Sequence, residues 1–359
     1  MLKSMDVAKA KGKKKRQRHK VTNHTLSKVE GGQSNFCASW PLLFTSYFLL
    51  FTLLFSTGCN SEQQSVNLYV DAVTLREHNE NEKAVEKLNS AIQSDKQFSL
   101  AYSLLGEIYR EMRDYKKSAA SYEKATTLNP WSFKDYFNLG QVCQIMKNFA
   151  RAVRAYSRAC ELAPEHLEAH VNAAKCYYQI KDYNRALVYG VRAERIDPDV
   201  SEVQKILGDI YGSKKDYEQA IQAYKRALEI DSNNIQIKLS LAVTYLRAER
   251  SSVAEELLTS IIQVQPNNTT AYKYLGYCYL QLDKIDKSIE SYRKALEIND
   301  KDWEAYRGLG VAYMVGALNS KDDQLKEKAV EQWRLSLDIK PDQPRREKLL
   351  KLIRKYSEK

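Results

Sequence analysis

The chain has 359 residues, of which 43% are hydrophobic and 10% aromatic, and this composition excludes a wholly disordered protein. Thirteen glycines and seven prolines are few for a strand-and-turn protein of this length, so the composition favours helices. The net charge of +11 lies at the two ends, because residues 1–39 carry +8 and residues 344–359 carry +5. The residues between these ends are nearly neutral and give no indication of a nucleic-acid groove.

Residues 1–39 form a basic tail that contains the run "KAKGKKKRQRHK". We expect this tail to be disordered and, if it is not removed, to stay in the cytoplasm, because Lys and Arg hold the flank of a membrane segment on that side. A nucleic-acid-binding arm is the alternative for this tail, and a start codon further along would shorten it. We expect no nucleic-acid partner for the rest of the chain.

Residues 40–58 form an apolar segment. Fourteen uncharged residues run from Leu42 to Phe55, and a count from Trp40 to Thr57 gives eighteen. The shorter count suits the hydrophobic region of a signal sequence, and the longer one is the lower limit for a membrane-spanning helix, so length leaves both open. Both interpretations place the residues from Cys59 onward across the membrane, with residues 59–64 as a short tether.

The segment ends in "FSTGCN", which resembles the lipobox of bacterial lipoproteins. Thr57 and Gly58 fit that pattern, whereas Ser56 stands where the lipobox prefers Leu. The resemblance implies that Cys59 is lipidated and that the protein is membrane-associated and extracytoplasmic, on the periplasmic face of a bacterium. Asn60 is not the Asp associated with inner-membrane retention, which favours the outer membrane. The alternative anchor is an uncut helix over residues 40–57.

Residues 65–343 repeat one pattern every 34 residues. The eighth place of the unit is always small: Ala72, Gly106, Gly140, Ala174, Gly208, Ala242, Gly276 and Gly310. A second column is mostly bulky: Leu88, Tyr122, Tyr156, Gly190, Tyr224, Leu258 and Tyr292. Such columns predict two helices per unit that cross closely at the small residue, with the bulky residue filling the space beside the crossing. Pro130, Pro164, Pro198 and Pro266 then end four of the units, because proline cannot continue a helix.

This period and these columns resemble the tetratricopeptide repeat family. The resemblance implies an all-α, right-handed superhelical solenoid of helix-turn-helix units. We expect eight units, at about 65–98, 99–132, 133–166, 167–200, 201–234, 235–268, 269–302 and 303–343.

The eighth unit and the chain end depart from the pattern. The insertion "VGALNSKDDQLKEK" places Ala329 seven residues later than the period requires, and we expect a longer turn between the two helices. Residues 344–359 predict an amphipathic capping helix, with Leu349, Leu350, Leu352 and Ile353 on one side. The alternative for this basic helix is a contact with an anionic membrane or an acidic partner.

The six cysteines show no spacing typical of a haem, zinc or redox motif. Cys143, Cys160, Cys176 and Cys278 fall within the helical pattern, where we expect them to be small buried hydrophobic residues.

No nucleotide-binding, nucleophile-elbow or metalloprotease motif is present, so we expect no catalytic residue, no metal and no cofactor. His166 and His170 share a helix face and are the best metal candidates. His170, however, occupies the fourth place, where other units put Tyr, so packing is the favoured interpretation of this pair.

The family resemblance also implies a concave groove, lined by the first helices, that accepts an extended peptide or a partner helix. No unit has the Lys and Asn pair at the fifth and ninth places that the chaperone-tail receptors of the family use. Asn138 and Asn172 resemble two rungs of the asparagine ladder in O-GlcNAc transferases, and the alternative is two solvated amides. The other candidate groove residues are Lys205, Lys273, Tyr274, Tyr277 and Arg307.

The sequence therefore predicts a non-catalytic, membrane-tethered scaffold whose partner is a protein or peptide. One alternative is an accessory subunit of an envelope, secretion or glycan-synthesis complex. Another is a relative of the O-GlcNAc transferase repeat domain that lacks the transferase.

Overall fold

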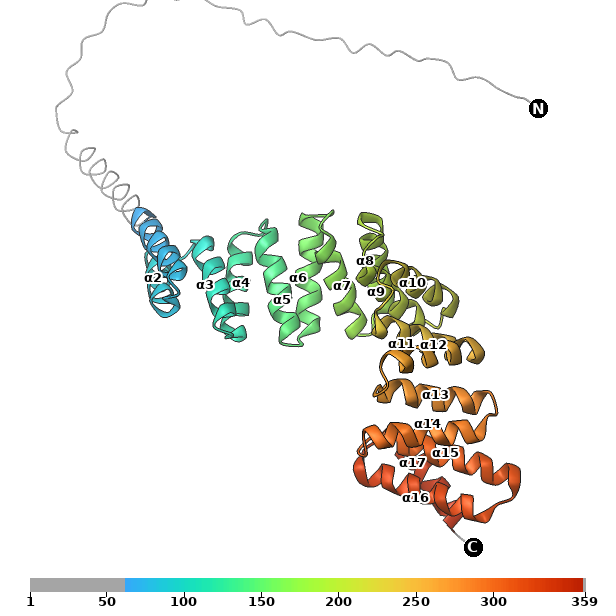
Figure 1. Ribbon diagram of the computed structural model, residues 1–359. Helices are drawn as coiled ribbons and strands as arrows, with labels where there is room; N and C mark the ends of the chain where they lie inside the picture. Colours follow the sequence, from blue (N-terminus) through green and yellow to red (C-terminus); the bar gives the residue numbers. More distant parts are fainter. Residues whose placement is uncertain (1–61, 358–359) are drawn as a thin grey trace, which may run out of the picture. The chain divides into compact units, whose positions relative to one another are not determined.

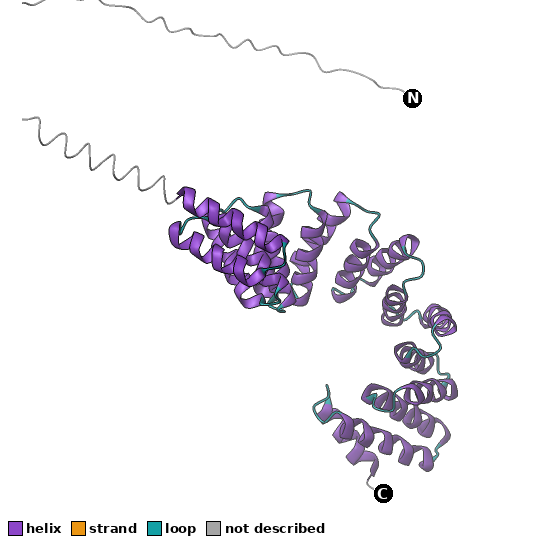
Figure 2. Ribbon diagram, turned by 60° about the vertical axis from the view of Figure 1, so that its left-hand side comes forward, coloured by secondary structure: helices purple, strands orange, loops and turns teal. Residues whose placement is uncertain are grey.

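The computed structural model describes residues 62–357. The predicted basic tail, the apolar segment and Cys59 lie outside the described residues. Secondary structure within residues 62–357 is entirely helical (Figure 2). Consecutive helices pack side by side along the chain (Figure 1), which confirms the predicted all-α solenoid.

Within residues 62–357 the helices form eight pairs followed by one last helix. The first helices are residues 62–77, α3 (Ser99–Glu111), α5 (Phe133–Ile145), α7 (Leu167–Gln179), α9 (Ser201–Ser213), α11 (Ile235–Arg247), α13 (Thr269–Gln281) and α15 (Trp303–Ser320). The second helices are α2 (Asn81–Ser94), α4 (Tyr115–Leu128), α6 (Phe149–Leu162), α8 (Tyr183–Ile196), α10 (Tyr217–Ile230), α12 (Ser251–Val264), α14 (Ile285–Ile298) and α16 (Asp323–Ile339). The last helix is α17 (Arg346–Ser357).

The turn inside each pair has the same backbone form. One residue of the turn has a left-handed conformation, with φ between 55° and 64°, and stops the first helix. These residues are Asn79, Arg113, Lys147, Lys181, Lys215, Glu249, Asp283 and Lys321. In several units an Asp or Asn follows at once and caps the second helix: the carboxylate of Asp114, for example, accepts the N–H of Lys117 at 3.1 Å.

In the units that have glycine at the eighth place, the helix crossing depends on the absence of a side chain there. A Cβ added at Gly140 would lie 2.6 Å from the ring of Tyr156, and one at Gly208 would lie 2.6 Å from the ring of Tyr224. Both rings are buried, so neither can move aside without opening the core. The predicted small and bulky columns are therefore in direct contact in the units that pair glycine with tyrosine.

Units that have Ala at the eighth place have a residue smaller than Tyr in the bulky column. Ala72 and Ala242 belong to the units of Leu88 and Leu258, and Ala174 belongs to the unit of Gly190. Gly190 lacks the ring that other units have at this place, and a side chain of the next unit fills the space. The Leu207 side chain comes within 3.0 Å of where a Cβ of residue 190 would be. The Ala side chain and the smaller partner thus compensate for one another.

The insertion in the eighth unit does not lengthen the turn, so that prediction is wrong. α15 has 18 residues where α13 has 13, and α16 has 17 where α14 has 14. Only Lys321 and Asp322 separate α15 from α16. The inserted residues favour helix over most of their length, and the left-handed stop has moved to Lys321.

The end of the solenoid is covered by α17. Leu349 and Ile353 are buried in the same cluster as Trp333 of α16, whereas Leu352 is exposed and Leu350 half-buried. The apolar side of the helix is therefore narrower than the four predicted residues. Gln343, just before α17, is also buried and donates to the Ser336 hydroxyl at 3.0 Å.

The cysteine prediction is confirmed. Cys143, Cys160, Cys176 and Cys278 are all buried and free. Burial raises the pKa of the Cys160 and Cys176 thiols to about 12 and that of Cys278 to about 11, so these thiols stay protonated at neutral pH.

Candidate functional site

The exposed sides of successive first helices adjoin, because side chains of one first helix bond to side chains of the next. We call this surface the first-helix face. In α3, α5 and α7 the residue at the ninth place bonds to the second place of the next unit. The pairs are Lys134 Nζ with Glu107 Oε1 at 2.5 Å, Gln141 Nε2 with Glu168 Oε1 at 3.4 Å, and Lys175 Nζ with Glu202 Oε1 at 2.6 Å.

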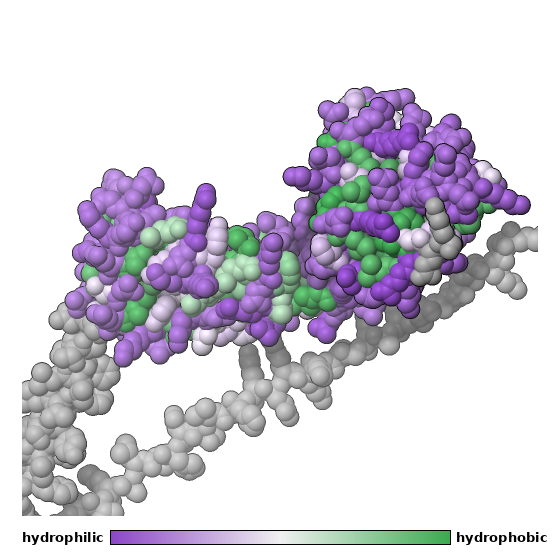
Figure 3. Space-filling view, turned by 90° about the horizontal axis from the view of Figure 1, so that it is seen from below, coloured by the Kyte–Doolittle hydropathy of each residue, from purple (hydrophilic) through white to green (hydrophobic). Residues whose placement is uncertain are grey.

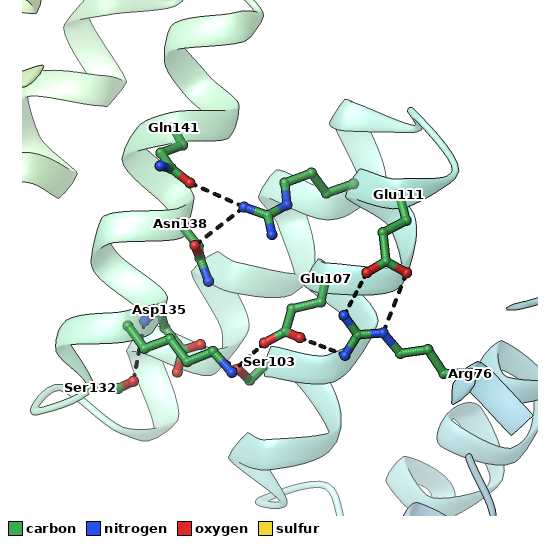
Figure 4. A network of polar contacts seen from close by, with 10 residues as sticks. Arg76, Ser103, Glu107, Glu111, Ser132, Asp135, Asn138 and Gln141 are labelled. Carbon is green, nitrogen blue, oxygen red and sulfur yellow. Dashed lines mark hydrogen bonds and ion pairs between the residues drawn. The ribbon is translucent and has the colours of Figure 1, made fainter. Parts of the chain in front are cut away.

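Glu107 is the centre of the polar network in Figure 4. Its carboxylate also accepts from Arg76 Nη1 at 2.7 Å, and Arg76 reaches Glu111 through Nη2 at 2.5 Å. Burial opposes the charge of Glu107, but Lys134 and Arg76 outweigh it and hold the pKa of the carboxyl below its ordinary value. Glu107 is therefore ionised and bridges three helices.

A second bridge lies beneath this network. The Ser103 hydroxyl donates to Asp135 Oδ1 at 2.5 Å, and both residues are buried (Figure 4). The Ser132 hydroxyl accepts the N–H of Asp135 and caps α5. These contacts fix α3 against α5.

Arg110 differs from the other cations of the face. Its Nη1 donates to two neutral amide oxygens, Asn138 Oδ1 at 3.4 Å and Gln141 Oε1 at 3.1 Å. Within residues 62–357 no carboxylate pairs with Arg110. The amides thus hold the guanidinium in place without neutralising it.

Two hollows lie beside these residues. One of about 510 Å³ is lined by Arg110, Gln141, Gln144, Ile145, Tyr156 and Asn172. The other, of about 380 Å³, is lined by Gln144, Phe149, Lys175, Cys176, Tyr178, Gln179, Glu202, Lys205, Ile206 and Asp209. They share Gln144, so together they extend over first helices α5, α7 and α9. Hollows of this size suit short pieces of ligand.

Three of the sequence-predicted site residues lie in this part of the face. Asn138 is buried and bound to Arg110, which is not the solvated position that the sequence left open. Asn172 lines the first hollow, and its amide donates to Glu168 at 3.4 Å. Lys205 lines the second hollow and pairs with Asp209 at 2.8 Å. The two asparagines stand at the same place of successive units but have different hydrogen-bond partners.

The other four lie on α13 and α15. Lys273 pairs with Asp302 at 2.9 Å and Glu304 at 2.7 Å, so its charge is already matched. Tyr274 is half-buried against the core, and Tyr277 is 46% exposed. Figure 3 shows apolar surface in both parts of the solenoid, with a broad patch at the C-terminal end among hydrophilic side chains.

Arg307 supports the cap. Its guanidinium lies 4.9 Å from the centre of the Trp303 ring, and Nη1 donates to the Pro344 carbonyl at 3.3 Å. Arg307 therefore joins α15 to the segment before α17, and of the predicted C-terminal patch Tyr277 has the most exposed side chain.

The two histidines have structural partners. His166 Nδ1 accepts the N–H of Ala169 at 3.2 Å and caps α7. His170 is buried, and its Nε2 donates to the Pro164 carbonyl at 2.9 Å. Over residues 62–357 no group of His, Cys, Asp or Glu could hold a metal ion.

Nothing in the structure bears on the predicted lipidation of Cys59, which lies outside the described residues. Over residues 62–357, no helix combines the length and the apolar character needed to cross a membrane.

Sequence reasoning missed Arg110 and Gln144. Both stand at the twelfth place of the unit, a column from which no candidate groove residue was taken. The twelfth-place residues are Arg76, Arg110, Gln144, Tyr178, Gly212, Leu246, Leu280 and Met314. Reading this column beside the fifth, sixth and ninth would have found the first hollow.

Comparison with known proteins identifies one matching family model, the cilia and flagella-associated protein 70 C-terminal domain, over residues 60–308. No curated protein matches the chain. Among solved structures, the repeat protein YrrB, described as having an unusual peptide-binding site, is 21% identical, with a TM-score of 0.44 over 58% of this chain and all of its own. MamA is 24% identical, with a TM-score of 0.44 over 47% of this chain and 92% of its own. A tetratricopeptide repeat protein of Parabacteroides merdae is 14% identical, with a TM-score of 0.48 over 70% and 99%.

Proposed function

This chain belongs to the cilia and flagella-associated protein 70 C-terminal domain family, and from that premise we propose that it is a non-catalytic scaffold that binds an extended peptide on its first-helix face. The observation that carries the proposal is the pair of adjoining hollows over α5, α7 and α9. They are open to solvent along a row of amide and charged side chains, as an extended backbone with its own donors and acceptors requires.

The state of the polar groups supports binding over catalysis. Lys175, Lys205 and Glu107 each have an opposite charge within 2.8 Å. A ligand that meets these pairs needs no compensating charge, whereas an acid or base catalyst requires a group free to exchange a proton with substrate. The pairing therefore favours a ligand recognised through backbone hydrogen bonds.

The apolar part of the same face supports a longer ligand. Tyr277 and Val311 stand at the ninth place of successive first helices, and both are exposed, at 46% and 39%. Exposed aromatic and aliphatic side chains at one place of the unit suit the apolar side chains of a bound segment.

The membrane tether stays part of the proposal. The lipobox-like "FSTGCN" supports lipid on Cys59, and the apolar segment before it supports an uncut anchor. A Cys59→Ser variant that keeps its membrane association and its mass would contradict the lipid form. Radiolabelled palmitate incorporation into the wild-type chain, lost in Cys59→Ser, would support it.

Selection from a displayed library of random peptides on the immobilised full-length chain tests the scaffold function. Two double variants, Gln144→Ala/Asn172→Ala and Tyr277→Ala/Val311→Ala, each remove one part of the face. We expect each to lose most of the peptides that the wild-type chain selects.

The matched control is Val188→Ala/Val264→Ala, which changes two exposed valines on second helices. This variant should select the wild-type set. If no peptide is enriched by the wild-type chain, or if the control loses as many peptides as the two face variants, the proposed function is wrong.

A further inference from the structure

Five basic side chains belong to the described first helices from residue 62 to the end of α9. They are Arg76, Arg110, Lys134, Lys175 and Lys205. Four of them pair with carboxylates at 2.5–2.8 Å. Arg110 is the exception in this part of the structure, because its acceptors are the two neutral amides of α5.

The guanidinium of Arg110 has donors to spare. Both of its hydrogen bonds start from Nη1, so Nη2 and Nε have no acceptor within residues 62–357. An arginine offers five N–H donors in a planar fork that fits the two oxygens of a carboxylate. Arg110, whose Nη2 and Nε are the unused donors, lines the hollow of about 510 Å³.

A buried hydroxyl of the same unit also lacks a partner within residues 62–357. In the third and fifth units the bulky tyrosine bonds to the first helix of its own unit: Tyr156 donates to Gln144 at 2.8 Å, and Tyr224 donates to Asp209 at 2.6 Å. Tyr122 is fully buried, and its hydroxyl has no hydrogen-bond partner within residues 62–357. In the second unit, therefore, the Arg110 guanidinium and the Tyr122 hydroxyl both have hydrogen-bond donors that no residue of 62–357 accepts.

The surroundings limit the charge of the missing partner. Glu107 and Glu111 lie on the same helix as Arg110, and Glu168 lies on α7 beyond Gln141. Arg76 and Lys134 already pair with Glu107 and Glu111, so a dianion such as a phosphate would find only one unpaired guanidinium to balance it. A single negative charge matches a single guanidinium.

We propose that Arg110 binds the carboxylate of an Asp or Glu side chain in an extended peptide that lies across the first-helix face. The peptide continues into the second hollow past Gln144, and the carboxylate that Arg110 binds belongs to one of its side chains. Asn138 and Gln141 are positioning residues that hold Nη1 and leave Nη2 and Nε to the ligand. This inference rests on the proposed function and names the chemistry of its ligand.

Synthetic peptides taken from the displayed-library selection test the proposal by fluorescence polarisation on the full-length chain. We expect the selected peptides to share one acidic position. Changing that acid to its amide should weaken binding about tenfold to hundredfold, the usual effect of losing one charge-assisted bidentate contact. Higher ionic strength should reduce the difference between the acid and amide peptides.

The variant Arg110→Gln should bind the acid and amide peptides equally, because the charge that distinguishes them is gone. Arg110→Lys keeps the charge without the fork and should show an intermediate preference. The matched control is Arg195→Gln on the exposed side of α8, which should keep the full preference. Circular dichroism melting of each variant separates loss of binding from loss of fold.

Other results would overturn the inference in distinguishable ways. If the acid-to-amide change in the peptide weakens binding equally to the wild-type chain and to Arg110→Gln, the acidic side chain binds at a residue other than Arg110. Tighter binding of a phosphoserine peptide, or a preference that depends only on a free C-terminal carboxylate, names a different anion. Selected peptides with no shared acid contradict the inference and leave the proposed function standing, whereas no selected peptide contradicts both.

Discussion

The two halves of the first-helix face differ at one place of the repeat. At the ninth place, α3 to α9 present Glu107, Gln141, Lys175 and Asp209, and α11 to α15 present Val243, Tyr277 and Val311. The polar residues of the first half bond to neighbouring helices, whereas Tyr277 and Val311 remain exposed. One helical framework thus supports two surfaces, because the packing of the small and bulky columns does not require a particular residue at the ninth place.

The packing of helices within a unit should contribute equally to stability in the two halves. Variants that disrupt this packing should therefore have the largest effect on the free energy of unfolding. Tyr156→Ala and Tyr292→Ala each remove a buried ring beside a glycine, Gly140 in one half and Gly276 in the other. Each variant should lose about 3–5 kcal/mol of unfolding free energy. Urea denaturation followed by circular dichroism measures this loss.

A control for these variants is Tyr277→Ala, since that ring is exposed and outside the crossing. Hydrogen exchange should show that each core variant loosens its own half more than the other, because repeats contact only their neighbours. A loss below about 1 kcal/mol in either half would contradict a shared framework.

The polar half should depend on its bridging charge. Glu107 has a side chain 10% exposed between Arg76 and Lys134, whereas Glu304 in the other half is 50% exposed beside Lys273. Glu107→Gln should cost about 1–2 kcal/mol and Glu304→Gln less than about 0.5 kcal/mol. Denaturant titration at neutral pH provides both values.

The sign of the pH dependence at Glu107 follows from its lowered pKa. Its contribution is present above the ordinary value of 4.5 and is lost as the pH falls through the lower folded value. The difference between wild type and Glu107→Gln should therefore shrink below pH 4.5. A difference that stays constant would show that the charge is not what stabilises the bridge.

The apolar half should hardly depend on its exposed residues for folding. Tyr277→Ala/Val311→Ala should change the unfolding free energy by less than about 0.5 kcal/mol, because neither residue fills the core. A thermal melt checks this. A larger loss would mean that these side chains stabilise α13 and α15, and their loss of ligands in a selection would then have a trivial cause.

The smallest expected effect is on the pH dependence of stability. It concerns the fourth place of the unit, where α7 has His170 and the other half has Tyr272 and Tyr306. Burial lowers the pKa of His170, although its hydrogen bond to the Pro164 carbonyl acts in the opposite direction. The nearby Arg192, Glu165 and His166 have smaller effects on this pKa. Its contribution to stability is present above pH 6.5 and is lost as the pH falls through the folded value.

His170→Tyr should remove this part of the acid sensitivity. Melting temperatures of the two chains should diverge as the pH falls below 6.5, with the variant less affected. Parallel curves would contradict the role given to His170.

The sequence was sufficient to predict the solenoid, because the small and bulky columns report helix crossings within a unit. It was insufficient at the insertion, since both a longer turn and longer helices satisfy the same length. The site was harder to predict because its bonds join different units. The partners of Lys273 stand 29 and 31 residues further along, at Asp302 and Glu304, and no single column shows that pairing.

The contact between the small and bulky columns also constrains how such a chain can change over generations. Gly106, Gly140, Gly208 and Gly276 each face a tyrosine, whereas Ala72 and Ala242 share their units with leucines. A mutation of glycine alone collides with the ring, and a mutation of tyrosine alone leaves a void. A unit passes from one pairing to the other only through a weakened intermediate, which is tolerated most easily while the neighbouring units on both sides hold it in place.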